Sequence, residues 1–412
     1  MVAQEEPVLR QALSLREVIE KYPGVSPFAI IKADIQRRTV RYTPAALAAV
    51  NPSVHQVEYV GYNINKKDTA IPCSLLLRDG TTVMSGPLPT RQKPYIVDVV
   101  DGRTVLTDDG EVVEEVSYWH APDYYRQRTS SGKPMWHVIS ARPQRLDINP
   151  YNYCHFWDNG HGCKFCAIAA TYHQHKDEKE LRHSPTDIAE TVGEAIRQPG
   201  RFANILLTGG SNTHGVEAFD DEVDYYIEVL QAIGTRFETP RFPSQLIATA
   251  FSEKQLSRLH ENTGIMSYTS DLEVLNEERF NWICPGKAEW VGYREWKQRL
   301  FRAVDIFGRG YVNSGIVGGV ELAKPHGFES EDDALKTTLE EAETLAERGV
   351  SVVYCVWNTL PGSVFHKQTL PSLEYYVRLA KGLQGLRDKY GLNIDMDNYR
   401  RCGNHPDTDL AR

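Results

Sequence analysis

The sequence predicts an α/β protein in which a small β-rich N-terminal domain precedes a partial barrel of six parallel strands with helices outside. Strand-like runs alternate with helical patterns six times after about residue 140, and parallel strands need crossovers of this kind. Before residue 125, short β-rich runs are separated by hairpin-type dipeptides instead. Six strand–helix units rather than eight would leave a TIM-like (βα)6 barrel incompletely closed. The 412 residues, 41% of them hydrophobic, are enough to fill two cores.

The N-terminal part is predicted to hold two short helices, around 13–21 and 44–50, and then an antiparallel β region from 56 to 118. Three dipeptides typical of hairpins separate the β runs: Asp79-Gly80, Asp101-Gly102 and Asp109-Gly110. The polar stretch at 126–134 predicts a linker. The expected organisation is an N-terminal α+β domain at 1–125, a linker at 126–140, the barrel at 141–392 and a tail at 393–412, which covers the barrel mouth or frays.

The first strand-like run of the barrel, 146–153, leads into a cysteine-rich loop. Its helix begins at Ser184-Pro185, where the chemistry suits an N-cap and first helical position, and it ends at Pro199-Gly200. The other strand–helix pairs are expected at 204–208 with 223–234, 245–251 with 253–261, 264–270 with 294–308, 311–319 with 332–349, and 350–357 with 373–391. In such barrels chemistry takes place at the carboxyl ends of the strands, so the cysteine-rich loop is a candidate active site.

Composition excludes several classes of function. The net charge is −9 and the 46 Lys and Arg residues are scattered, which argues against a nucleic-acid partner. No apolar run approaches the roughly 18 residues that span a bilayer, and the first residues do not resemble a signal peptide, so no membrane partner is expected. The seven cysteines are odd in number and mostly isolated. We therefore expect a cytoplasmic protein with reduced thiols.

Cys154, Cys163 and Cys166 follow the spacing C-x8-C-x2-C, which two kinds of site can use. One is a structural zinc site, with its fourth ligand drawn from His155, His161, His173 or His175. The other is a four-iron, four-sulfur cluster that three thiolates hold, leaving one iron open to an exogenous ligand. The four remaining cysteines either hold an auxiliary cluster or are small buried residues, and the second alternative is favoured because none lies in a C-x2-C pair: Cys73, Cys284, Cys355 and Cys402.

The sequence from about 140 to 400 resembles the radical S-adenosylmethionine (SAM) superfamily in several independent stretches. Residues 163–166 match the C-x-aromatic-C ending of the cluster motif, Thr208 to Ser211 resemble the Gly-Gly-Glu element after the second strand, and 314–321 match G-x-I-x-G-x-x-E except at the first position. The order of these elements and the amino-acid sequence of 267–280 are similar to those of the branch that contains biotin synthase, HydE and HmdB. The chain departs from the family in the eight-residue first gap, which a glycine-containing loop at 159–162 can accommodate, and in Ser211 where the family has Glu.

This resemblance implies a site as well as a fold. It implies one [4Fe-4S] cluster on Cys154, Cys163 and Cys166, with SAM chelating the open iron. It places the aromatic ring of Phe165 against the SAM adenine. The SAM contacts that it implies are Phe165, Gly209, Gly210, Ser211, Glu273, Arg299, Ile316 and Gly318. For Glu273 and Arg299 the alternative is an ordinary strand-end carboxylate and a solvated helix charge.

The implied activity is reductive cleavage of SAM to a 5′-deoxyadenosyl radical, which abstracts hydrogen from a small molecule. We expect C-methylation or a change of carbon skeleton in cofactor or natural-product biosynthesis, with an electron donor such as flavodoxin or ferredoxin. No cobalamin is expected, because the N-terminal region lacks a doubly wound pattern and a D-x-H-x-x-G signature. The alternatives are a radical SAM lyase or rearrangement enzyme, a peptide-modifying radical SAM enzyme, and a zinc or iron–sulfur protein with a structural or electron-transfer role.

Overall fold

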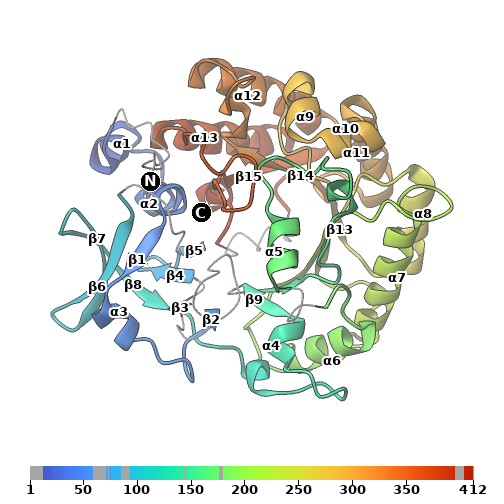
Figure 1. Cartoon of the computed structure of the whole chain (residues 1–412), viewed down its shortest axis with the longest axis horizontal. Coiled ribbons are helices and arrows are strands. Elements are labelled where there is room, and N and C mark those ends of the chain that lie inside the picture. The colour runs from blue at the N-terminus through green and yellow to red at the C-terminus, as the bar shows by residue number, and fades with distance from the viewer. Residues whose placement is uncertain are drawn as a thin grey trace.

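The computed structural model describes residues 13–58, 71–72, 74–84, 93–142, 144–175, 180–394 and 403–411, and the structural statements below concern these residues. The chain forms two main sheets (Figure 1). A six-stranded sheet lies in the N-terminal part, and a seven-stranded sheet follows it in the chain. This arrangement confirms a mixed α/β protein with two β-containing parts.

The larger sheet contains the predicted run of parallel strands. Its order is β15-β14-β13-β12-β11-β10-β9, and β10 to β15 pair in parallel in chain order, whereas β9 pairs antiparallel with β10. The strands are β9 (Ser140–Arg142), β10 (Arg145–Ile148), β11 (Asn204–Thr208), β12 (Ser244–Ile247), β13 (Ser267–Thr269), β14 (Val312–Gly318) and β15 (Val350–Val356). β10, β12 and β13 are shorter than the runs 146–153, 245–251 and 264–270 predict, and the chain beyond each strand instead forms irregular loops at the carboxyl edge.

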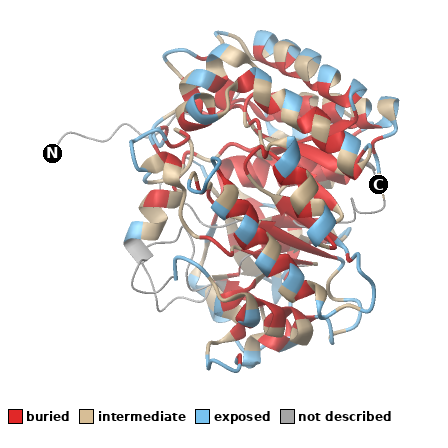
Figure 2. Ribbon diagram, turned by 90° about the vertical axis from the view of Figure 1, so that its right-hand side faces the viewer, coloured by how far each residue is buried: buried red, intermediate tan, exposed pale blue. Residues whose placement is uncertain are grey.

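Helices cover the outer face of this sheet and confirm the alternating pattern. The helices that follow β10 to β15 are α6 (Pro185–Ala195), α7 (Asp220–Gly234), α8 (Glu253–Asn262), α11 (Tyr293–Phe307), α12 (Glu331–Glu347) and α13 (Leu373–Tyr390). Alternate strand residues such as Leu146 and Ile148 belong to the apolar core that these helices share. Figure 2 shows the consequence: strands and inward helix faces are buried, and the outer helix faces are exposed. The shorter elements are α4 (Met135–Val138), η2 (His155–Trp157), α5 (Ile168–His175), α9 (Glu277–Ile283), α10 (Pro285–Trp290) and η3 (Val320–Leu322).

The N-terminal sheet has the order β1-β6-β7-β8-β4-β5. Its strands are β1 (Val40–Tyr42), β4 (Ser74–Leu77), β5 (Thr82–Met84), β6 (Tyr95–Val100), β7 (Arg103–Asp108) and β8 (Glu111–Tyr118), and β2 (Val57–Glu58) pairs with β3 (Ile71–Pro72) separately. The predicted hairpins are confirmed, since Asp101, Gly102, Asp109 and Gly110 all have positive φ at the turns. The sheet is not wholly antiparallel, because β1 pairs in parallel with β6.

The two short N-terminal helices are confirmed as α1 (Leu15–Lys21) and α3 (Pro44–Ala48), but a longer helix between them escapes sequence prediction. α2 (Pro27–Arg38) is buried along most of its length. Its Ile30 packs in the barrel core, whereas Ile31 packs in the core of the N-terminal sheet. α2 therefore joins the two cores, and the exact domain limits stay a prediction.

The segment predicted as a linker is packed rather than free. It runs from the end of η1 (Asp123–Arg126) through α4 to the start of β9. Ser130 Oγ donates to Glu190 on α6 at 2.6 Å, and Lys133 Nζ lies 3.0 Å from an oxygen of Asp187 on the same helix. The polar composition that suggested a linker instead serves these contacts with α6.

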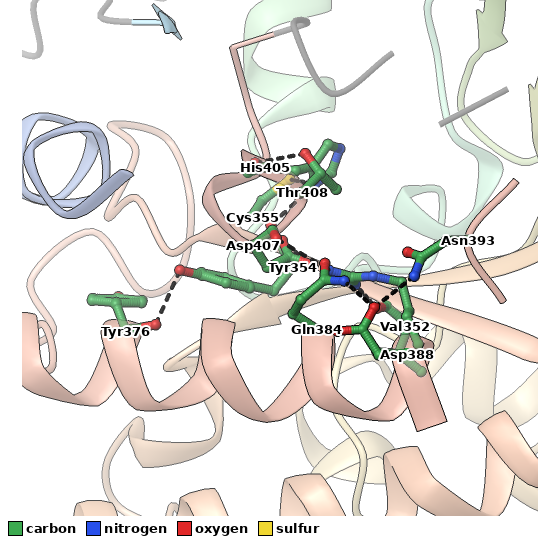
Figure 3. A network of polar contacts seen from close by, with 11 residues as sticks. Val352, Tyr354, Cys355, Tyr376, Gln384, Asp388, Asn393, His405, Asp407 and Thr408 are labelled. Carbon is green, nitrogen blue, oxygen red and sulfur yellow. Dashed lines mark hydrogen bonds and ion pairs between the residues drawn. The ribbon is translucent and has the colours of Figure 1, made fainter. Parts of the chain in front are cut away.

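The described part of the predicted tail, residues 403–411, is packed: it lies along β15, the edge strand of the larger sheet, and between β15 and α2. It contains η5 (Pro406–Ala411). Asp407 accepts from the backbone N–H of Tyr354, and the Cys355 thiol lies 3.6 Å from His405 (Figure 3). On the other side, Gln36 of α2 donates to the carbonyl of Gly403 at 2.6 Å. No helix among the described residues is long and apolar enough to cross a membrane.

Candidate active site

The cysteine loop follows β10 at the carboxyl edge of the parallel strands, as the barrel topology predicts. Between Cys154 and Cys163, the chain forms η2 and then an exposed turn at 158–161. Gly160 has a φ of +73°, and a side chain at Gly162 would collide with the indole ring of Trp157. The eight-residue gap is thus taken up by a short 3₁₀ helix and an outward turn that two glycines make sterically feasible.

Backbone hydrogen bonds from three other loops hold the cysteine loop. The N–H of His155 donates to the carbonyl of Ser211 at 2.8 Å, after β11. The N–H of Lys164 donates to Ile283 at 2.9 Å, after β13, and its carbonyl accepts from Phe365 at 3.0 Å, after β15. Because the loop is fixed from three sides, its three thiols are positioned by the barrel rather than by a local turn alone.

The surroundings of the sulfur atoms suit thiolate ligands of a cluster. The backbone N–H groups of Phe156 and Ser211 act to lower the pKa of Cys154, against the effect of burial, and the N–H of Ile168 lies 3.4 Å from Cys166 Sγ. Burial raises the pKa of Cys154 to about 12, with a further contribution from Cys163, so this thiol holds its proton until a metal displaces it. Hydrogen bonds to sulfur are among the features that tune iron–sulfur clusters. The residues present therefore fit a [4Fe-4S] cluster.

The histidines of the zinc alternative point elsewhere. His155 lies between the Tyr151 hydroxyl at 2.5 Å and the Asp158 carboxylate at 2.7 Å, and His161 contacts Glu289. His173 is exposed, and the side chain of His175 lies outside the described residues. Within the described chain, no group of three or more Cys, His, Asp or Glu side chains is arranged to hold a single metal ion. These contacts favour three thiols with a cluster over a zinc site that uses a histidine.

Gly209 and Gly210 pack directly against the cysteine loop. A Cβ at Gly210 would collide with the carbonyl of Tyr153 and lie 2.5 Å from Cys154 Cβ. A Cβ at Gly209 would lie 2.8 Å from the carbonyl of Tyr151. The sequence predicts that these glycines open a surface to SAM, but the structure gives them a second role, because the absence of side chains lets the loop after β11 touch the residues around Cys154.

Glu273 and Ile316 come together, although Glu273 lies beyond β13 and not on the strand as predicted. Glu273 forms an isolated parallel bridge with Ile316, and its φ of +67° is in the left-handed region. Its carboxylate contacts Lys287 Nζ at 2.7 Å, and that ammonium also donates to the carbonyl of Asp271. Burial raises the pKa of Glu273 to about 7, opposed by Lys287. Lys287 is a charged group that sequence reasoning missed, and it interacts electrostatically with Cys163.

The remaining predicted SAM contacts are spread more widely. Arg299 donates to the carbonyl of Ala250 at 2.8 Å, just beyond β12, and pairs with Glu295. A Cβ at Gly318 would lie 2.8 Å from Leu379 of α13, so this position faces the helix layer, and Ile316 is likewise part of the core. Only backbone atoms at 316 and 318 are left to line the inner side. Phe165 is half-buried at the edge of the barrel core.

Glu222 is the second group that sequence reasoning missed. It lies in the first turn of α7 and is buried, and it accepts hydrogen bonds from Asn212 N–H at 2.8 Å and Thr249 N–H at 3.2 Å. The sequence shows it only as one of three acidic residues that begin a helix, with Asp220 and Asp221, a pattern that the helix dipole explains. Its contacts depend on the loop before its own helix and on the loop after β12, and sequence periodicity does not reveal that these meet.

Two isolated cysteines are also placed. Cys284 is fully buried and its thiol hydrogen-bonds to that of Cys163, whereas Cys355 contacts His405 in the C-terminal segment. These two are therefore apart from each other, and Cys73 and Cys402 lie outside the described residues. An auxiliary cluster on the four stays an untested alternative.

Comparison of the amino-acid sequence with known proteins identifies a related enzyme. No protein-family model matches the chain. The chain is 25% identical over 325 residues to bacteriochlorophyllide c C-7(1)-hydroxylase of Chlorobaculum limnaeum, an alignment that spans 74% of this chain and 76% of the hydroxylase.

Two solved structures show limited similarity. A radical SAM methyltransferase from Sphaerobacter thermophilus aligns with a TM-score of 0.43 and 15% identity over 97% of this chain and 99% of that one. The cobalamin-dependent S-adenosylmethionine radical enzyme OxsB aligns with a TM-score of 0.34 and 12% identity over 76% of this chain and 48% of that one. The sequence relative is an enzyme by its name, and both solved structures are named as radical SAM enzymes.

Proposed function

We propose that the protein cleaves SAM reductively and uses the resulting 5′-deoxyadenosyl radical to abstract hydrogen from a small molecule in cofactor or natural-product biosynthesis. The single observation that carries this proposal is the loop with Cys154, Cys163 and Cys166 at the carboxyl edge of the parallel strands, held from three sides. When bound, a [4Fe-4S] cluster on these thiols supplies the electron that cleaves SAM.

The protein's own residues would position and enclose the reactants. The loop at 209–211 lies against Cys154, so a SAM molecule on the open iron would meet its backbone. Phe165 would lie against adenine, and Glu273 with Lys287 offers a carboxylate and an ammonium beside the cysteine loop. Arg299, which is fixed on the carbonyl of Ala250, would bound the site on the β12 side. These assignments follow the family resemblance and remain proposals.

For the outcome on the substrate, we propose C-methylation or a change of carbon skeleton, as the resemblance to the biotin synthase, HydE and HmdB branch implies. A lyase or rearrangement enzyme starts from the same hydrogen abstraction. Three further points stay predictions: that the enzyme needs no cobalamin, that its electron donor resembles flavodoxin or ferredoxin, and that it is cytoplasmic. Modification of a peptide substrate stays an alternative to a small-molecule substrate.

Hydroxylation is a second candidate reaction, and a specific observation favours it. The relative in Chlorobaculum limnaeum is named a hydroxylase, and the two chains align over about three quarters of each. Hydroxylation of a carbon atom and methylation of one can both begin with removal of its hydrogen. The two candidates therefore differ in what happens to the substrate radical, which neighbouring groups decide.

The experiment uses anaerobically reconstituted protein, a chemical reductant and SAM. We expect slow formation of 5′-deoxyadenosine with SAM alone, and faster formation with a true substrate. With a substrate deuterated at the attacked carbon, mass spectrometry should find deuterium in the 5′-deoxyadenosine. A turning-over reaction that yields S-adenosylhomocysteine without 5′-deoxyadenosine would replace this proposal with a polar methyl transfer. A colourless protein that contains zinc would replace it with the structural alternative.

A further inference from the structure

The loop after β11 is tied to the cysteine loop and also to helix α7. Ser211 lies at the centre of these contacts: its carbonyl accepts from the N–H of His155, the neighbour of Cys154, at 2.8 Å, and its backbone N–H acts to lower the pKa of the Cys154 thiol. Its hydroxyl lies 2.6 Å from Thr249 Oγ1, beyond the end of β12. The position of Cys154 therefore depends on where Ser211 lies.

A single carboxylate fixes the neighbours of Ser211. Both oxygens of Glu222 are used as acceptors, one from the N–H of Asn212 at 2.8 Å and the other from the N–H of Thr249 at 3.2 Å. Thr249 Oγ1 lies 3.0 Å from the first of these oxygens. Glu222 is 4% exposed, and no cation among the described residues pairs with it. A carboxylate without a cation is costly to bury, and this one accepts hydrogen bonds from two strand-end loops at once, one of them the loop of Ser211.

We infer that Glu222 is a positioning residue that locks the loops after β11 and β12 together and so holds both Cys154 and the backbone that meets SAM. Two backbone N–H groups converge on one carboxylate, and a neutral amide at this position would turn a donor toward one of them. The carboxylate is supplied from α7, eleven residues after Ser211, and not from the loop itself. This inference rests on the proposed function, because it concerns the same site.

The test compares Glu222→Gln with Glu331→Gln. Glu331 is a matched control because it also lies in the first turn of a helix, α12, and accepts a backbone N–H and a hydroxyl, both from Ser372 before α13, at 2.8 and 2.6 Å. Iron content, the dissociation constant for SAM and the melting temperature are measured on anaerobically reconstituted protein. We expect E222Q to bind SAM about tenfold more weakly, the scale for leaving a buried donor unpaired. E331Q should bind SAM within twofold of the wild type while its melting temperature falls.

Equal losses of SAM affinity in the two variants, or an unchanged affinity in E222Q, would overturn the inference. If E222Q does not fold, Thr249→Val and Thr249→Ser replace it, since only the valine variant loses the hydroxyl next to Ser211 and Glu222. The valine variant should then bind SAM more weakly than the serine variant, and equal binding would contradict the inference. A wild-type protein that takes up neither iron nor SAM would instead contradict the proposed function.

Discussion

Two buried polar networks in this protein are built differently. Along the C-terminal segment, charges are paired: Lys32 contacts Asp409 at 2.6 Å and Arg387 contacts Asp407 at 2.7 Å, with all four side chains nearly inaccessible. Beside the cysteine loop, Glu222 accepts only neutral donors. The first network joins distant parts of the chain, and the second lies next to the loop that carries Cys154.

We interpret the paired charges as a structural network and the contacts of Glu222 as part of the candidate site. A buried ion pair with good geometry fixes which segments meet, at the cost of desolvating both partners. A buried carboxylate without a cation has no such partner, so its role depends on what it joins: Glu222 joins the loops after β11 and β12 beside Cys154, whereas Glu321 contacts Gly319 and Tyr375. We expect changes in the C-terminal network to alter stability and changes around Cys154 to alter iron and SAM binding. The predictions below test this division.

The largest expected effect comes from Lys32→Met. This change leaves Asp409 buried without its cation, which costs about 3–5 kcal/mol of unfolding free energy. Denaturant unfolding would measure the loss, and the protein that remains folded should keep its iron content. The double variant Lys32→Met/Asp409→Leu should recover most of the stability. Loss of iron in proportion to stability would contradict the division between the two networks.

An exposed ion pair provides the control for that experiment. Arg16 and Glu20 lie 2.9 Å apart on α1, with side chains 90% and 62% exposed. Because exposed pairs are solvated and screened, Arg16→Met should shift the denaturant midpoint of unfolding far less than Lys32→Met does. A comparable shift would mean that exposure does not separate the two pairs.

The next effect concerns pH. Burial raises the pKa of Glu321 from 4.5 to about 7, so between these values the folded state holds a proton that the unfolded state has lost. The contribution of Glu321 to stability is therefore fully present below about pH 4.5 and is lost as the pH rises to 7, by about 3 kcal/mol. Unfolding curves from pH 4.5 to 8 should be flatter for Glu321→Gln than for the wild type. Parallel curves would show that Glu321 does not titrate in this range.

A smaller effect on stability than that of Lys32→Met, but a selective one on the site, comes from Gly210→Ala. The added Cβ meets Tyr153 and Cys154, and overpacking of this kind costs about 1–3 kcal/mol. Iron content after reconstitution should fall. Gly385→Ala is the control, because nothing lies within 4 Å of its Cβ on α13 and alanine favours the helix. Equal iron in both variants would mean that Gly210 does not control the position of Cys154.

Sequence periodicity predicted the elements whose patterns are local. The helices from α6 to α13 that cover the barrel have one apolar face, and the N-terminal hairpins have dipeptides that suit positive φ. α2 was missed because it has no single apolar face: Lys32, Asp34 and Arg37 are buried there through ion pairs or hydrogen bonds. The partners of α2 in the C-terminal segment are more than 360 residues away along the sequence, and no local sequence pattern predicts these contacts.

The residues of the candidate site also fall into those that sequence could predict and those that it could not. The cysteines and the glycines at 209 and 210 were found because cluster ligation and close backbone approach demand particular residue types. Glu222 and Lys287 were missed because Glu and Lys are ordinary on helices, and only tertiary contacts distinguish them. Ile316 and Gly318 were assigned from a motif, whereas strand alternation turns both positions toward the helix layer.

The most direct test of the central claim is the metal content of anaerobically reconstituted wild-type protein beside the variant in which Cys154, Cys163 and Cys166 are all alanine. We expect about four iron atoms and four sulfides per wild-type chain, a brown colour, and an electron paramagnetic resonance signal of the reduced cluster that changes when SAM is added. The triple variant should lose all three features while it stays folded. A variant with wild-type iron content, or a wild-type signal that SAM leaves unchanged, would contradict the account.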